Sequence, residues 1–530
     1  MKEWFRKYPV YCVMAFFTLC VAPVLVMRDF TPANELRYLS VADEAIAQGH
    51  VFTFTNQGEI YADKPPLFFW ILMLCRLLFG RYSMPVLSLL SLIPAFVTVA
   101  VMDRWALRKS SPRTRAAAAM MLLTTALFLG MAVYVRMDML MCMFIVLALF
   151  SFWKERYALF GLFTFLALFT KGPIGLLLPT LAVILYLTVS GRSKELSKAF
   201  DWPFWAVLLG LIALWLTGVY LESGRDYLYN LLFHQTFGRA VNAFHHKAPF
   251  WFYGVVIWGV AAPWCLLTIP SVVIVLFGRR GPLRDYLFSR QAKTRLFAGT
   301  VFLGFILLSV FSSKLAIYLL PLLPFLNYAF VRLVQRSGWR TWMRWSLSLT
   351  TLVFAAVGIA IVVGFFLFDR LPIPAEYSFA RTPLLILAGL ILLSGSIVAL
   401  TRVRDGWQHP VMILGASLLL GAVVLTPLQP AVNKVTGYGA LCEEIQAVAP
   451  EGEVLAIGLS RPEGMDVYLH RSVRALDPDK LLRNPSLLPS EAAVVLSRKK
   501  DAAASFRYSG ILEESGRTCV SESASYTVWR

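Results

Sequence analysis

Long apolar runs alternate with short polar segments along residues 1–429. The runs at 9–27, 83–103, 116–135, 203–220, 297–311, 345–367, 383–401 and 411–428 each approach the length at which a helix crosses a hydrocarbon layer of roughly 30 Å. Further apolar segments at 139–153, 157–170, 173–190, 251–277 and 315–331 extend the same pattern. The pattern predicts an all-α polytopic membrane protein.

Composition supports a membrane protein and changes how the net charge is interpreted. The chain is 58% hydrophobic and only 15% charged, whereas soluble domains carry roughly 25% charged residues. Its net charge of +19 would suggest nucleic acid as the partner of a soluble protein. In a membrane protein the excess of Lys and Arg indicates cytoplasmic loops that face anionic lipid.

Clusters of basic residues predict the topology. They lie at 2–7, 104–115, 154–156, 192–198, 279–295, 332–344 and 402–404. If every cluster is cytoplasmic, an even number of spans separates each cluster from the next. The segment 67–80 would break this parity, and it is short and contains Arg76, so we expect it to lie at the outer interface as an amphipathic helix. The total is about 13 transmembrane helices, with the N-terminus cytoplasmic and the C-terminus outside.

This topology places the remaining polar segments on one face of the membrane. They are the polar part (28–66) of a first outer loop at 28–82, the hairpin tips at Arg136/Asp138, Lys171 and Lys314, and the loop at 221–250. Outer loops must be polar in any case, but convergence of five separate segments on one face also favours an active site there.

The composition changes after the last apolar run, so we expect two domains, 1–429 in the membrane and 430–530 outside it. Residues 439–449 have a helical pattern, and 453–459, 466–470, 492–497 and 525–530 have strand patterns separated by Pro and Gly. They predict a small α/β domain. Its two cysteines, Cys442 and Cys519, would be able to form a disulfide outside the cytoplasm if they meet.

Four cations on the predicted outer face are candidates for binding a phosphate group. They are Arg37 and Lys64 in the first loop, and Lys171 and Lys314 in apolar surroundings on hairpin tips. A charge in apolar surroundings needs an anionic partner. Pairing of these side chains with ordinary lipid phosphates is the simpler alternative.

The outer segments also contain carboxylates and histidines. Glu35, Asp43 and Asp138 are available as general bases or cation ligands, although Glu35 also fits an ordinary polar helix face. Asp63 and His246, with His245 as the alternate, have the ligand types of a divalent metal site for Zn or Mg. A surface histidine pair is more often solvated than bound to metal.

An ordered set of motifs resembles a known enzyme family. The motifs are NELRY (34–38), DKPP (63–66), YVRMD (134–138), FTKGP (169–173), HHKAPFWFY (245–253) followed by APW (262–264), and SSKLAIYLLPLLP (312–324). Together they resemble polyprenyl-phosphate-dependent glycosyltransferases of the C-type membrane fold. The chain looks most like the bacterial aminoarabinose transferases that modify lipid A, and more distantly like protein O-mannosyltransferases.

This resemblance implies an undecaprenyl-phosphate-linked sugar donor and an acceptor such as lipid A at the periplasmic face of the bacterial inner membrane. Lys64 and Arg37 would hold the donor phosphate together with Lys171, Lys314 and Tyr318. Asp138 matches an acidic residue of the second outer loop. Asp63 and His246 match the family's metal position.

One position departs from the family. Relatives have Asp-Glu where this chain has Asn34-Glu35, and that Asp is assigned to catalysis or acceptor positioning. Asn cannot accept a proton, so Glu35, Asp43 or Asp138 would have to replace it, or the acceptor needs no base. A phosphate monoester, with a second pKa near 6, is already a nucleophile at pH 7. Altered or lost activity is the third option.

We therefore expect a glycosyltransferase that displaces the donor phosphate at the anomeric carbon with inversion. Protein or another envelope glycan is the alternative acceptor. A flippase or transporter of lipid-linked sugars would bind its substrate near the bilayer midplane, often between repeated halves. A non-catalytic scaffold is the remaining alternative, and Asn34 is its main support.

Overall fold

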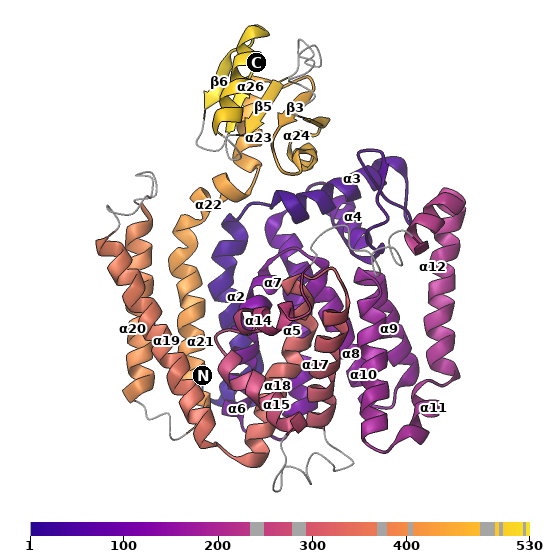
Figure 1. Cartoon of the computed structure of the whole chain (residues 1–530), viewed down its shortest axis with the longest axis vertical. Coiled ribbons are helices and arrows are strands. Elements are labelled where there is room, and N and C mark those ends of the chain that lie inside the picture. The colour runs from indigo at the N-terminus through magenta and orange to yellow at the C-terminus, as the bar shows by residue number, and fades with distance from the viewer. Residues whose placement is uncertain are drawn as a thin grey trace. The chain divides into compact units, whose positions relative to one another are not determined.

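The computed structural model describes residues 2–233, 248–277, 293–367, 379–400, 406–477, 493–497, 502–522 and 526–530 (Figure 1). The chain divides into two units. The first comprises Met1–Val26, Ala62–Phe68 and Pro85–Pro427, and the second comprises Met27–Tyr61, Phe69–Met84 and Leu428–Arg530. Each unit is therefore discontinuous in sequence, and residues of the predicted first outer loop occur in both.

The first unit is helical throughout its described residues. Its main helices are α1 (Lys2–Lys7), α2 (Pro9–Met27), α5 (Met84–Ala106), α6 (Pro112–Leu123), α7 (Ala126–Val133), α8 (Met137–Trp153), α9 (Tyr157–Lys171), α10 (Ile174–Val189), α11 (Leu196–Ala199), α12 (Trp202–Tyr229), α14 (Phe252–Val260), α15 (Cys265–Phe277), α17 (Lys293–Val310), α18 (Leu323–Ser337), α19 (Thr341–Phe366), α20 (Arg381–Leu400) and α21 (Gln408–Leu425). Short 3₁₀ segments lie at Ser193–Glu195, Ala316–Leu322 (η4) and Thr426–Leu428.

Most predicted apolar runs are single helices. Among the described residues, eight helices are long and apolar enough to cross a membrane, and a bent pair raises that number to nine. Helices α8, α9, α10 and α15 are apolar but shorter. The chain is a mostly helical, multi-pass membrane protein.

The run predicted as one span at 116–135 is not one continuous helix, because it is broken into α6 and α7, which are bent by 73°. Thr124 and Thr125 lie at the break, and their hydroxyls bond back to Met120 O and Met121 O. The next amide, Ala126 N, donates to Ala262 O at 2.8 Å instead of continuing the helix. Local hydroxyl bonds of this kind compete with the helical ladder.

The run at 251–277 is also two helices, α14 and α15, with Pro263 between them. Proline supplies no backbone N–H and obstructs a continuous helix. Trp264 donates to Thr124 Oγ1 at 3.0 Å, so the two breaks are packed against each other. The run at 315–331 likewise begins with the 3₁₀ segment η4, which contains Pro321, before α18 starts.

The second unit combines the first loop with the C-terminal segment. Its elements are η1 (Pro32–Leu36), α3 (Arg37–Gln48), β1 (Thr55–Asn56), β2 (Glu59–Ile60), most of α4 (Leu67–Phe79), α22 (Gln429–Thr436), α23 (Gly439–Val448), β3 (Val454–Ile457), η9 (Pro462–Met465), α24 (Asp466–Leu469), β4 (Val473–Leu476), β5 (Ala493–Ser497), α26 (Ala502–Glu514), β6 (Cys519–Glu522) and β7 (Tyr526–Trp529). The segment predicted as an interfacial helix forms α4, and its relation to a membrane stays a prediction.

The C-terminal strands form one mixed sheet in the order β4-β3-β5-β7-β6. β3 is parallel to β4 and β5, and β7 is antiparallel to β5 and β6. Alternate residues of β3 enter opposite cores: Val454 packs with residues of α23, and Leu455 packs with Leu512 of α26. The inner strands β3 and β7 are therefore buried on both faces, which explains their nearly continuous apolar sequence, whereas the edge strands β4 and β6 are partly exposed.

Two details of the C-terminal prediction differ. Residues 466–470 were expected to form a strand, but α24 occupies them, because the turn η9 leads directly into a helical turn that buries Val467 and Leu469. Strands β4 and β6 were not predicted.

Cys442 is buried and Cys519 is exposed, and no disulfide joins these two described residues.

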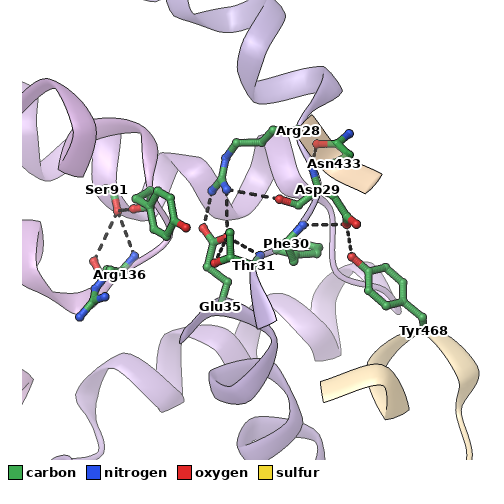
Figure 2. Close-up of polar contacts among 10 residues, drawn as sticks. Arg28, Asp29, Phe30, Thr31, Glu35, Ser91, Arg136, Asn433 and Tyr468 are labelled. Carbon is green, nitrogen blue, oxygen red and sulfur yellow. Dashed lines mark hydrogen bonds and ion pairs between the residues drawn. The ribbon is translucent and has the colours of Figure 1, made fainter. Parts of the chain in front are cut away.

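Asp29 ties the start of the first loop to the C-terminal segment inside the second unit (Figure 2). Its carboxylate accepts hydrogen bonds from Tyr468 Oη, from Gly439 N at 2.7 Å and from Phe30 N at 2.7 Å. Its own amide donates to Asn433 Oδ1 at 3.0 Å. One carboxylate thus joins the residues that follow α2 to the segment that follows α21.

Replacing this carboxylate is expected to loosen the C-terminal segment. Hydrogen bonds to a charged acceptor contribute roughly 1.5–3 kcal/mol each. In Asp29→Ala, amide hydrogen exchange in α23 should therefore accelerate by roughly tenfold to a hundredfold. Glu451→Ala, which removes an exposed carboxylate of the same unit, is the control. Unchanged exchange in Asp29→Ala would contradict this role.

Candidate functional site

A buried carboxylate between two cations forms the centre of the candidate site in the first unit. Asp138 lies in the first turn of α8 with no exposed surface. Arg136 Nε donates to Asp138 Oδ2 at 3.0 Å, and Lys171 Nζ, at the end of α9, pairs with Oδ1. Because both oxygens are occupied by cations, the carboxylate is held ionised and oriented.

Lys171 also joins α9 to the later hairpin. Its ammonium lies 4.7 Å from the centre of the Tyr318 ring, which belongs to η4. Cations at this distance from an aromatic face are attracted by the ring quadrupole. The structure therefore brings together three of the predicted site residues, Asp138, Lys171 and Tyr318, from three segments of the chain.

Lys314 is buried just before η4, with 5% of its surface exposed, and its ammonium donates to Phe311 O. A lysine held this deeply satisfies only part of its donor capacity with one carbonyl. Its burial agrees with the expectation of an anionic partner.

Ser91 of α5 fixes the segment that carries Arg136 (Figure 2). Its hydroxyl donates to Tyr134 O at 2.5 Å, and it accepts from Arg136 N at 3.4 Å. Residues 134–136 connect α7 to α8, so this contact anchors the extended link after the bent helix pair. Sequence analysis named Arg136 as a hairpin tip but did not include it in the site.

Asp63 and Lys64 also belong to the first unit. Lys64 Nζ donates to the backbone oxygen of Asp63 at 3.1 Å, and both side chains are half-buried. Pro65 and Pro66 follow and precede α4. Proline at the start of a helix is favourable because no N–H is lost there, so the DKPP motif fixes Lys64 at the N-terminal end of α4.

The catalytic candidates Asn34 and Glu35 lie in the second unit, on the π-helical turn η1 (Figure 2). The Leu36 amide donates to Thr31 O at 3.1 Å, the bond that defines this wide turn. Glu35 is 1% exposed, while Asn34 is half-buried. The turn thus points its two polar residues into different surroundings.

Glu35 is enclosed by an ion pair and by the backbone. Arg28 Nη1 donates to Glu35 Oε2 at 2.9 Å, and Nη2 pairs with Oε1. Thr31 adds hydrogen bonds to Oε2 from its amide at 2.9 Å and its hydroxyl at 3.0 Å. Both carboxylate oxygens therefore have donors, an arrangement that stabilises the shape of the loop.

Arg37 follows directly as the first residue of α3. Its guanidinium lies 4.7 Å from the centre of the Tyr61 ring. Tyr61 donates through its amide to Phe54 O at 2.8 Å and packs edge-on against Phe69. An aromatic platform thus orients Arg37 by a cation–π contact.

Asp43, the remaining carboxylate considered as a base, lies on α3. It accepts from Arg76 Nε of α4 at 3.1 Å and from Tyr82 Oη at 3.0 Å. Burial raises the pKa of Asp43, and the hydrogen bond from Tyr82 and the charge of Arg76 oppose that rise. These contacts join α3 to α4.

Asp466 is a further titratable group of the second unit, and sequence analysis did not identify it. Its Oδ2 accepts from Ser40 Oγ at 2.6 Å, while its buried Oδ1 has no hydrogen-bond partner among the described residues. The pKa of Asp466 is raised from 3.8 to about 6, mainly by burial, with smaller contributions from the negative charges of Asp43 and Glu463. Ser40 and the backbone of Val467 oppose the rise.

The metal prediction is only partly covered by the structure, since His245 and His246 lie outside the described residues. Asp63 is described, and among the described residues no three His, Cys, Asp or Glu side chains gather as metal ligands. A divalent metal at Asp63 and His246 stays a prediction.

Sequence analysis also did not identify Arg28 and Asp29 as residues that hold the first loop in place. They are the first charged pair after the apolar run of α2, and each forms a contact that fixes the loop. Their position at the end of the first span was the available signal. Their partners, at Glu35 and in the C-terminal segment, cannot be identified from spacing alone.

Comparison with known proteins agrees with the predicted resemblance. The family model described as dolichyl-phosphate-mannose-protein mannosyltransferase matches residues 63–219. The chain is 24% identical over 463 residues to the undecaprenyl phosphate-alpha-4-amino-4-deoxy-L-arabinose arabinosyl transferase of Shewanella sediminis, covering 84% of this chain and 81% of that protein. A protein of the same name, numbered 1, from Pseudomonas fluorescens is 27% identical over 350 residues, 62% of this chain and 58% of the relative.

The fold is similar to that of ArnT from Cupriavidus metallidurans, whose crystal structure contains undecaprenyl phosphate. The TM-score is 0.76 at 16% identity, with 98% of this chain and 96% of that chain covered. The C-type glycosyltransferase fold predicted from the motifs is therefore confirmed. The resemblance to aminoarabinose transferases and, more distantly, to protein mannosyltransferases is confirmed as well.

The raised pKa of Asp466 predicts how the stability of the second unit depends on pH. The folded state binds this proton more tightly than the unfolded state, so its contribution to stability is present at low pH and decreases as pH rises from about 4 to about 6. The total decrease is on the order of 3 kcal/mol.

Thermal unfolding of wild type and Asp466→Asn between pH 4 and pH 7 measures this contribution. We expect the wild type to lose stability relative to Asp466→Asn as pH rises, because Asn cannot ionise. Parallel curves for the two proteins would show that Asp466 is not the titrating group.

Proposed function

We propose that the chain is a glycosyltransferase that moves aminoarabinose from undecaprenyl phosphate to lipid A or another cell-envelope acceptor. The observation that carries this proposal is the buried cluster of Asp138, Lys171 and Tyr318 in a fold shared with a structure bound to undecaprenyl phosphate. The names of the relatives, which are arabinosyl transferases, support the proposed identities of the sugar and of its donor.

The cluster suits the electrostatic part of the reaction. The acceptor oxygen forms a bond to the anomeric carbon while the bond from that carbon to the donor phosphate oxygen breaks, which inverts the anomeric configuration. Negative charge increases on the leaving phosphate, and preorganised cations away from bulk water stabilise such charge strongly. Lys171 is already oriented by Asp138 and Tyr318, and Lys64 and Lys314 of the same unit complete the proposed phosphate ligands. Arg37 stays a phosphate ligand predicted from the resemblance alone.

The topology belongs to the same proposal. About 13 spans, with the N-terminus cytoplasmic, would place the site and residues 430–530 at the periplasmic face of the inner membrane. The eight or nine long helices among the described residues and the shorter apolar helices support this number.

Glu35 is assigned to loop positioning rather than to proton transfer. Its oxygens already accept four hydrogen bonds from Arg28 and Thr31. The Asn34 side chain forms no hydrogen bond among the described residues, so it is available to contact an acceptor. A phosphate monoester acceptor, such as a phosphate group of lipid A, would then react without a protein base.

A protein acceptor is the second candidate. The mannosyltransferase model matches residues 63–219, which include Lys64, Asp138 and Lys171. A serine or threonine hydroxyl would need a base, and the three carboxylates considered as bases, Glu35, Asp43 and Asp138, are each paired with a cation. This arrangement favours the phosphate acceptor.

Removal of Lys171 is expected to abolish most transfer. In Lys171→Ala the leaving phosphate loses one preorganised cation, and the rate should fall by about 10²–10³-fold. Transfer from undecaprenyl-phosphate aminoarabinose to lipid A, followed by mass spectrometry, measures the effect. Lys198→Ala removes an exposed lysine of α11 and should retain activity, and Lys171→Arg should retain part of it. Equal rates in wild type and Lys171→Ala would refute the site.

The pH dependence distinguishes the two acceptors. With a phosphate acceptor, the rate should rise with pH through about 6, following the second ionisation of that group, and then level off. Asn34→Ala should have the same pH profile, since position 34 transfers no proton. A profile that shifts with Asn34→Asp, or transfer to a peptide hydroxyl alone, would favour the protein acceptor.

A further inference from the structure

A basic cavity lies in the first unit at the opposite end of the helices from Asp138. It has a volume of about 240 Å³ and is bordered by the last residues of α5 and α8, the first residue of α17 and Arg332 of α18. Asp138 and Lys154 lie at opposite ends of α8, about 24 Å apart along its axis. A single water needs only roughly 10–15 Å³ by the same kind of measure, so the cavity has room for a phosphate-sized group.

Six cations border this cavity, and none of its ten lining residues is acidic. Lys293 and Arg332 are half-buried, and the other four are exposed at the rim: Arg104, Arg108, Lys109 and Lys154. The nearby Asp103 does not neutralise them, because both of its oxygens bind Arg115. The cavity therefore concentrates positive charge without a described counter-ion.

The two inner cations have contacts that use only part of their donor capacity. Lys293 Nζ donates to Trp105 O at 2.5 Å, and Arg332 Nη1 donates to Ala106 O at 3.3 Å. These carbonyls end α5, where positive charge is favourable. Capping of α5 does not account for Arg332 Nε, which is buried and has no hydrogen-bond partner among the described residues. A buried donor without an acceptor is costly.

The surroundings indicate a lipid rather than a soluble anion. The wall includes Trp105, Phe150 and Trp153, and Trp is enriched where helices meet the membrane interface. Lys154 and Lys293 lie 5.7 and 5.8 Å from the ring centres of Phe150 and Trp153. Basic pockets between membrane helices of this kind bind anionic lipid headgroups. Loop charges that only set topology would not need a cavity with a half-buried guanidinium.

We propose that this cavity binds the phosphate of an anionic phospholipid from the leaflet at that end of the helices. Arg332 and Lys293 contact the phosphate from inside, and the rim cations surround the headgroup. Of the aromatic wall, the half-buried Phe150 and Trp153 adjoin the acyl chain, whereas Trp105 is buried behind them. The proposal is independent of the transfer reaction, because none of these residues belongs to the cluster around Asp138.

Retention of phosphatidylglycerol by the full-length protein tests the proposal. The protein is purified in a neutral detergent, titrated with phosphatidylglycerol and measured by native mass spectrometry. Arg108→Gln/Lys154→Gln removes two exposed rim cations, and Arg340→Gln/Arg344→Gln removes two exposed cations near the start of α19 that do not line the cavity. We expect affinity to fall by about tenfold or more in the first variant only.

The controls separate the possible outcomes. Elution volume and melting temperature confirm that both variants fold, and Arg332→Lys, which keeps the charge but removes the buried Nε–H, should also weaken retention. An equal loss in both double variants would mean general surface attraction and would overturn the proposal. Binding of inorganic phosphate with the same variant dependence, without retention of phosphatidylglycerol, would also overturn it by identifying a site for soluble anions.

Discussion

The need to pair every charge that an apolar chain buries governs the structure. Asp138 is fully enclosed, and it is stable there because Arg136 and Lys171 bind both of its oxygens. Removing one partner of such a group typically costs about 3–5 kcal/mol. The pairing therefore fixes the ends of α8 and α9 with respect to each other. It also leaves a net positive charge, which is what binding of a phosphate requires.

In the second unit, the acidic side chains of the first loop are likewise paired with donors. Glu35 is enclosed by Arg28 and Thr31, and Asp29 accepts hydrogen bonds from the distant C-terminal segment. The C-terminal segment thus does more than follow the last helix, because Asn433, Gly439 and Tyr468 of its helices hold Asp29 in the loop that starts at the end of α2. A loop whose charges are satisfied internally can hold Asn34 in a defined position.

Much of this arrangement follows from residue patterns, and some of it does not. Run length predicted the long helices, since burial of backbone polar groups leaves few alternatives in a membrane. Pro263 itself signals a break, but the break at Thr124 packs against the distant Trp264 and cannot be inferred from its own neighbourhood. The motifs predicted Asp138, Lys171 and Tyr318 as site residues, but not that Lys171 contacts the other two. Asp466 was missed because only tertiary burial makes it unusual.

The contacts of η1 have an evolutionary consequence for position 34. Arg28, Thr31 and Glu35 constrain one another, so a change at any of them requires compensation by the others. The side chain of Asn34 takes no part in that network among the described residues. Exchange between Asn and Asp at this position therefore leaves these contacts intact, and under the proposed function a lineage would alter the acceptor chemistry there by a single substitution without refolding the loop.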